Sequence, residues 1–234
     1  MAQRPVFVVS AEVPHFKKEL ITFQFFSGFA QSQKRKSIES LHTTFLQTHP
    51  QERVLEISSM SEDEIGVKLS AFNLEIKTLD GRRYSVESAF QSSKVFEHGG
   101  PYKDLLGKSS REAKKDSRLK TSGALKAFYF SNKQFSLQPE TYFYNWLYIH
   151  ALDLHPELSD KIMEYTAFTD IAFNPEKAKN CQACAAAVYV SLKKSGMLAE
   201  ALEDPKAFLQ IVYGIDSREK EKGASNTNEQ ITMW

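Results

Sequence analysis

A segment in the first half of the chain gathers side chains that can do chemistry. Glu87, Gln91 and Lys94 are spaced i, i+4 and i+7, which places them on one face of a predicted helix, with Phe90 beside them. A carboxylate, an amide and an amine next to an aromatic ring can bind and cleave a ligand. The same spacing also suits a solvated helical face with an ordinary Glu–Lys pair, and spacing alone favours that second interpretation.

The surroundings of this helix resemble the NADAR family, also called YbiA-like. Three elements carry the resemblance: Ser70-Ala71-Phe72, Asp80-Gly81 and Glu87-x-x-Phe90-Gln91-x-x-Lys94. In the family they read S-N-F, D-G and E-x-x-[YF]-Q-A-x-K, so Ala71 departs from the pattern. Later positions that resemble family motifs are Ser109-Ser110-x-x-Ala113, Arg118 and Asn180.

The chain is most similar to the NADAR branch that is encoded beside DarT-type DNA ADP-ribosyltransferase toxins. This resemblance implies an antitoxin, functionally paired with a DarT-type toxin, that acts on ADP-ribosylated DNA. It further implies an ADP-ribosyl glycohydrolase that releases ADP-ribose from the exocyclic amino group of guanine, with no metal and no cofactor. Two alternatives stay open: an N-glycosidase acting on a riboflavin-pathway or NAD-derived metabolite, and a non-catalytic antitoxin that masks the toxin.

The residues offer chemistry that suits an N-glycoside. Breaking the bond at ribose C1 builds positive charge on the sugar and requires a proton for the leaving amine, so two carboxylates could divide the work. Glu87 is the first candidate because the family motif places it there, and Asp170 is the second, although a loop cap explains Asp170 equally well. A lysine could instead attack C1 and form a Schiff base, and Lys94 and Lys36 are the candidates. Lys36 precedes a helix predicted at 37–47, where it could also hold phosphate or belong to a solvated basic turn.

Other side chains could hold the ADP-ribose or the base. Arg118 is the member of a basic stretch that the family pattern favours for the pyrophosphate. Asn180 and Gln182, at the start of a predicted helix, could bind ribose or phosphate. Phe72 and Phe90 could stack on a base, although aromatic residues at such positions are more often core. Ser70 and Gln91 join the set through the motif.

The elements that must position these residues follow from local patterns. Strands are predicted at 5–10, 20–26, 53–58 and 74–78, followed by an Asp80-Gly81 hairpin turn. Helices are predicted at 37–47 with Ser37 as cap, from Ser85 to about Glu97, and at 110–119, 139–152, 179–195 and 205–213, with one more opening at Pro156. The sum is an α+β fold, mostly helical: a YbiA-like single domain with a small antiparallel sheet. We expect the domain to span residues 1–216, with 1–66 a branch-specific extension, 67–196 the family core, and 217–234 a disordered tail.

Bulk composition limits the class of protein. The 234 residues carry a formal net charge of +1, which is too balanced for a protein that wraps DNA backbone over a large area. Cys181 and Cys184, the only cysteines, read as small buried residues in an alanine-rich helix, and no histidine has metal-ligand spacing. Neither a signal peptide nor a membrane span is expected, so the sequence predicts a cytoplasmic protein, and we expect a monomer.

Overall fold

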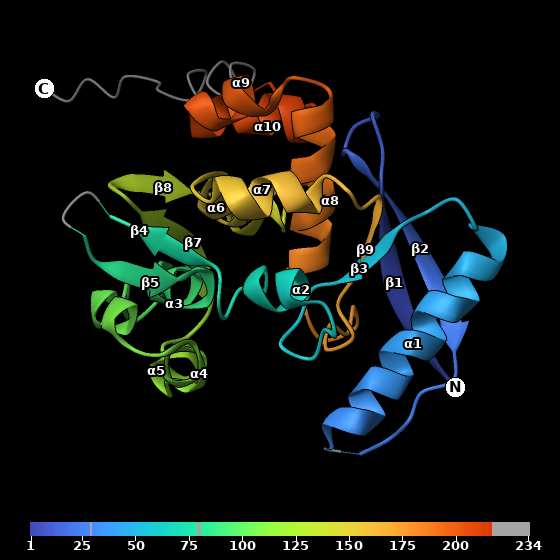
Figure 1. Ribbon diagram of the computed structural model, residues 1–234. Helices are drawn as coiled ribbons and strands as arrows, with labels where there is room; N and C mark the ends of the chain where they lie inside the picture. Colours follow the sequence, from blue (N-terminus) through green and yellow to red (C-terminus); the bar gives the residue numbers. More distant parts are fainter. Residues whose placement is uncertain (29, 79–80, 217–234) are drawn as a thin grey trace, which may run out of the picture.

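The N-terminal part of the chain folds as a sheet, because its strands are rich in Val, Ile and Phe. The computed structural model describes residues 1–28, 30–78 and 81–216. In it β1 (Ala2–Val9) pairs antiparallel with β2 (Phe16–Phe23) along its whole length (Figure 1). β9 (Ala167–Thr169) pairs antiparallel with β1 and parallel with β3 (Val54–Glu56), which gives the order β2-β1-β9-β3. Neighbouring residues of β1 face different clusters: Val6 packs with α1 (Gln31–Thr48), and Phe7 joins the main core.

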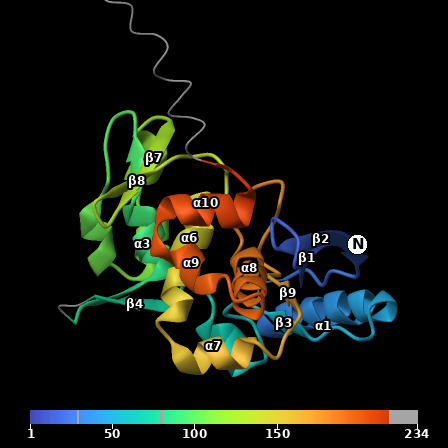
Figure 2. The same cartoon turned by 90° about the horizontal axis from the view of Figure 1, so that it is seen from above.

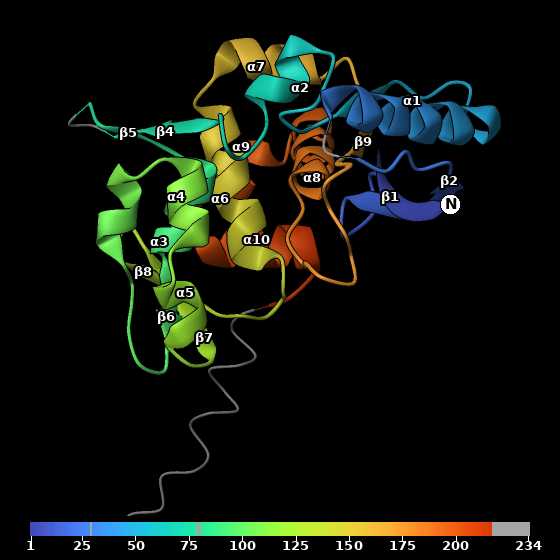
Figure 3. The same ribbon diagram turned by 90° about the horizontal axis from the view of Figure 1, so that it is seen from below.

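Helix α1 begins earlier than the sequence predicted. Figures 2 and 3 show it lying alongside β1 and β2 at one end of the molecule. Ser37 lies buried inside the helix, where its hydroxyl accepts from the Phe26 N–H at 2.9 Å and donates to the Gln33 carbonyl at 3.0 Å. The prediction that Ser37 caps the helix is therefore wrong, and Lys36 lies within the helix instead of at its N-terminus.

The middle of the chain forms a hairpin, a short helix and a second sheet. β4 (Glu75–Lys77) and β5 (Arg83–Ser85) pair as the predicted hairpin, although residues 79–80 of its turn lie outside the described residues. α3 (Val86–Ser92) follows, with the Ser85 hydroxyl accepting from the Ser88 N–H, so the predicted cap is confirmed. The predicted extension of this helix to Glu97 is wrong, because Lys94–Phe96 forms β6. That strand pairs with β7 (Leu125–Phe130), which in turn pairs with β8 (Lys133–Phe135).

The core sits around two central helices, α6 (Tyr142–Asp153) and α8 (Gln182–Lys194). α6 begins at Tyr142, after Pro139, and nearly all of its residues are buried. The alanines of α8 let it pack closely against α6. The remaining helices are α2 (Glu64–Lys68), the 3-10 helix η1 (Lys103–Gly107), α4 (Ser110–Lys115), α5 (Arg118–Thr121), α7 (Pro156–Ile162), α9 (Leu198–Glu203) and α10 (Pro205–Tyr213).

The architecture confirms the α+β class, mostly helical with small antiparallel sheets. β3 and β9 are the exception, since they pair parallel. Several elements were not predicted, among them α2, β7, β8, β9 and α9. The helix predicted at 110–119 is divided into α4 and α5 at Asp116. The tail predicted to be disordered, 217–234, lies outside the described residues. Within the part of the chain that the structure describes, no helix combines the length and apolarity needed to cross a membrane.

Candidate active site

Most of the residues singled out from the sequence meet at one cavity of about 370 Å³. Its lining residues come from α3, β6, α4, β7 and α6 and from the segments 58–59, 70–72 and 170–182. Figure 3 shows α3 and α4 on one side and the segment that leads into α8 on the other. Residues far apart in the sequence thus contribute to one site.

Glu87 is held in the cavity wall by the first turns of α3. Val86 and Ala89 are fully buried in the core, which turns Glu87, Phe90 and Gln91 toward the cavity. The Glu87 side chain is itself buried, and its Oε1 accepts from Gln91 Nε2 at 2.8 Å. Lys114 Nζ lies 3.5 Å from the same oxygen. The i, i+4 pair therefore forms, but as a buried carboxylate with a fixed donor and not as a solvated helical face.

Lys94 reaches the same cavity from a different element. It is the first residue of β6, so the shared helical face that its spacing suggested does not exist. Its Nζ lies 4.8 Å from the centre of the Phe90 ring. Burial lowers the pKa of Lys94 to about 8, the carboxylate of Glu87 partly opposes this, and the charge of Lys114 adds to it. At pH 7 a pKa of about 8 leaves roughly one Lys94 in ten neutral and nucleophilic, against fewer than about one in a thousand for an ordinary lysine.

Asp170 also lines the cavity and is almost fully buried. Its Oδ1 accepts the backbone N–H groups of Ala172 and Phe173 at 3.0 and 3.2 Å. Burial raises the pKa of Asp170, and the charge of buried Glu56 raises it further. The backbone contacts of Asp170 fit the loop-cap interpretation, and they place a carboxyl with a raised pKa at the cavity.

Gln182 serves the walls of the cavity. Its Nε2 donates to Asp170 Oδ2 at 3.0 Å and to the Ile57 carbonyl at 2.6 Å, and its Oε1 accepts the Ala71 N–H at 2.7 Å. Three segments of the chain are joined by this one side chain. Because both ends of its amide are occupied, Gln182 positions Asp170 and the 70–72 segment rather than offering groups to a ribose.

Three buried polar atoms at the cavity lack partners among the residues that the structure describes. They are Ser70 Oγ, Gln91 Oε1 and Asn180 Oδ1, and all three side chains line the cavity. Buried polar groups in proteins are almost always paired, so unpaired ones require an explanation. A ligand rich in hydroxyl groups, such as a ribose, would supply the missing donors.

The two phenylalanines of the motif have different surroundings. Phe90 packs in an aromatic cluster, with ring centres 5.3 Å from Phe128 and 5.1 Å from Tyr144, so one part of it belongs to the core. Phe72 is 39% exposed, and Lys114 Nζ lies 5.0 Å from the centre of its ring. Of the two, Phe72 has the face on which a base could stack.

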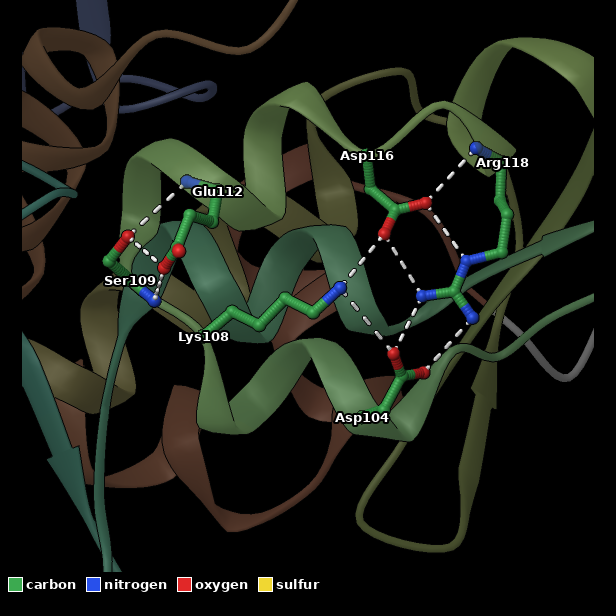
Figure 4. A network of polar contacts seen from close by, with 6 residues as sticks. All are labelled: Asp104, Lys108, Ser109, Glu112, Asp116 and Arg118. Atoms are coloured by element: carbon green, nitrogen blue, oxygen red, sulfur yellow. Dashed lines mark hydrogen bonds and ion pairs between the residues drawn. The ribbon is translucent and has the colours of Figure 1, made fainter.

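Arg118 and Lys36 do not line this cavity. The guanidinium of Arg118 pairs with Asp104 and Asp116, the closest contacts being 2.6 and 2.9 Å (Figure 4). The same guanidinium lies over the Tyr102 ring. These contacts hold η1, α4 and α5 together. Lys36 is exposed on α1.

The sequence interpretation missed several contributors. Lys114 and Tyr144, which both line the cavity, were not singled out from the sequence. Glu56 was not singled out, yet it is a fully buried carboxylate that accepts from the Thr169 hydroxyl at 2.6 Å and the Ile171 N–H at 2.9 Å. Burial raises the pKa of Glu56. A single acid inside the apolar run Val54-Leu55-Glu56-Ile57 was the signal that could have found it.

Comparison with known families identifies the family of the chain. The family described as DarT1-associated NADAR antitoxin matches residues 2–222. The chain belongs to this family, so the resemblance stated from the sequence is confirmed. No curated protein matches the chain.

Proposed function

We propose that this member of the DarT1-associated NADAR antitoxin family is an ADP-ribosyl glycohydrolase that removes ADP-ribose from guanine bases of DNA. The observation that carries the proposal is the meeting of the buried Glu87 carboxylate and the low-pKa Lys94 in one cavity. An amine of perturbed pKa that shares a cavity with a buried carboxylate is typical of catalytic sites. The family supports the antitoxin role, and we expect the protein to act as a monomer in the cytoplasm, where its toxin and the DNA meet.

The reaction cleaves the bond between ribose C1 and the exocyclic nitrogen of guanine. Positive charge develops on the sugar, and Glu87 is the carboxylate that stabilises it. Water adds its hydroxyl group to C1, and its proton ends on the guanine amine, relayed by a carboxyl such as Asp170. Alternatively, the ribose ring opens by breaking its bond between C1 and the ring oxygen, and neutral Lys94 Nζ attacks C1. The guanine amine then leaves with a proton that Nζ gives up, and water hydrolyses the resulting Schiff base to free Lys94 and ADP-ribose. The lowered pKa of Lys94 favours the second route, and borohydride trapping distinguishes the two.

The remaining polar groups suit the rest of the substrate. Ser70, Gln91 and Asn180 would pair with ribose hydroxyls through their unpartnered oxygens. Lys114 and Lys179 also line the cavity and would face the pyrophosphate. The exposed ring of Phe72 would stack on the guanine.

The test is turnover of a defined oligonucleotide that carries ADP-ribosylated guanine, followed as free ADP-ribose and restored guanine. Glu87→Gln should lower kcat by about a hundredfold or more while the protein stays folded, since it removes the charge from a preorganised site. Glu200→Gln, an exposed acid of α9, is the matched control and should keep full activity. Absence of ADP-ribose release by the unmodified protein at every pH would overturn the proposal.

The same variants separate the alternative functions. A metabolite N-glycosidase would act on small N-ribosides and not on the oligonucleotide. If the protein were a masking antitoxin, its Glu87→Gln variant would protect cells from the toxin as well as the unmodified protein does. The proposal requires that this variant lose protection.

A further inference from the structure

A second cavity, of about 760 Å³, is larger than the active site and shares no lining residue with it. It lies among the β4–β5 hairpin, β7 and α6, elements that Figure 1 shows side by side. Nearby residues of the same element line different cavities: on β7, Phe128 lines the active site and Tyr129 the second cavity. On α6, Tyr144 lines the first and Trp146 the second. β7 and α6 thus form a partition with a binding space on each side.

The walls of the second cavity are aromatic, with Tyr84, Tyr129, Phe130 and Trp146 among its lining residues. Trp146 is 7% exposed, and its Nε1 has no hydrogen-bond partner among the residues that the structure describes. An indole N–H can only donate, so an acceptor is missing there. The oxygen or ring nitrogen of a flat aromatic ligand would provide one.

The rim carries positive charge. Lys77, Arg82 and Lys103 line the cavity, and no Asp or Glu does so among the described residues. A smaller cavity of about 500 Å³ adjoins it, shares Lys103 and Tyr129, and adds Lys126, which pairs with Glu97 at 2.7 Å. In a chain with 30 basic and 29 acidic residues, such segregation favours an anionic ligand.

We propose that these two adjoining cavities bind a short stretch of single-stranded DNA, with one base stacked in the larger cavity. Aromatic surfaces with cations along their edge are how proteins bind single strands without sequence preference. The two compartments meet at Lys103 and Tyr129, which suits successive nucleotides better than one free nucleotide. The naming of DNA as the ligand rests on the proposed function: the strand would be the DNA that flanks the modified guanine.

The test measures binding and needs no turnover. The chain has two tryptophans, so Trp234→Phe leaves Trp146 as the sole reporter. Its fluorescence is titrated with an oligothymidylate of about ten nucleotides and, separately, with thymidine monophosphate. We expect the oligomer to change Trp146 emission and to bind more weakly as salt is raised. Lys103→Glu should weaken binding about tenfold or more, whereas Lys17→Glu, an exposed lysine of β2, should change it less than about twofold.

A second charge reversal, Lys77→Glu, guards against a local fold defect in Lys103→Glu, and it should weaken binding in the same direction. The proposal is overturned if Trp146 does not respond to the oligomer. It is also overturned if Lys17→Glu weakens binding as much as Lys103→Glu, or if the mononucleotide binds as tightly as the oligomer. An inactive glycohydrolase could pass this test and an active one could fail it, so the two proposals fail separately.

Discussion

Replacing Lys94 with methionine should stabilise the folded protein while removing its proposed nucleophile. Lys94 is charged at pH 7 in the folded and in the unfolded chain, but in the fold its ammonium has lost much of its water. The folded pKa is therefore lowered, from 10.5 to about 8. A lysine whose pKa is lower in the folded than in the unfolded chain reduces the free energy of unfolding. The reduction is complete below about pH 8 and disappears as the pH rises through 10.5.

The size of the effect follows from the same values. At 1.36 kcal/mol per pH unit, lowering the pKa from 10.5 to about 8 corresponds to about 3 kcal/mol at pH 7. The partial exposure of Lys94 reduces this figure. The substitution also removes the contact between the Lys94 ammonium and the Phe90 ring, which is worth about 0.5–1 kcal/mol. A net gain of about 1–2 kcal/mol at pH 7 remains, falling below about 1 kcal/mol at pH 10.

Urea unfolding of both proteins at pH 7 and pH 10 measures this difference. Other groups that titrate in this range are shared by both proteins and cancel in the comparison. Lys17→Met, at an exposed lysine, is the control and should show no such pH dependence. If Lys94→Met gains nothing at pH 7, or gains the same at both pH values, the burial argument for a neutral, nucleophilic Lys94 is refuted.

Four other variants test other parts of the structure. Arg118→Ala should lower the melting temperature and leave kcat/KM for modified DNA unchanged, because its ion pairs with Asp104 and Asp116 lie outside the cavity; lost turnover at unchanged stability would contradict this. Asp170→Asn should gain stability relative to the wild type as pH rises from 4 to 8, because the raised pKa makes ionised Asp170 unfavourable in the fold. Parallel pH profiles of the two proteins would show that this pKa is not raised. Phe72→Ala should raise KM with little loss of stability, whereas Phe90→Ala, which empties a buried site, should cost about 3–5 kcal/mol by urea unfolding.

The sequence predicted the elements that local chemistry determines. The Ser85 cap, the hairpin before it, and the helices at Pro156 and Pro205 were all confirmed, because each depends on neighbouring residues alone. β9 was missed because Ala167–Thr169 becomes a strand only between β1 and β3, which come from distant parts of the chain. The end of α3 was missed for the same reason, since Lys94–Phe96 extends by pairing with β7.

Only the part of the candidate site that lies within one motif could be predicted from the sequence. Glu87, Phe90 and Gln91 lie on one helix, so their shared face could be read from spacing. Which residues lie across from them depends on the meeting of α4 and the 170–182 segment with α3, and no local pattern encodes it. Arg118 illustrates the opposite case, because the motif predicted a binding residue that does not line the cavity. Its ion pairs with Asp104 and Asp116, and not its position in a motif, decide whether it is available to a ligand.

The contacts of Ala71 explain how alanine can stand where the family motif has asparagine. Its backbone carbonyl accepts the Glu87 N–H at 2.9 Å, and its own N–H donates to Gln182 Oε1 at 2.7 Å. These two bonds join the wall that carries Glu87 to the wall that carries Asp170, and both use only backbone atoms of residue 71. The position can therefore exchange asparagine for alanine and still hold the walls together. Gln182 makes its part of this connection through its side chain, so its position does not tolerate such an exchange. A shorter or apolar residue there would leave the Ala71 N–H and Asp170 without their hydrogen-bond partner.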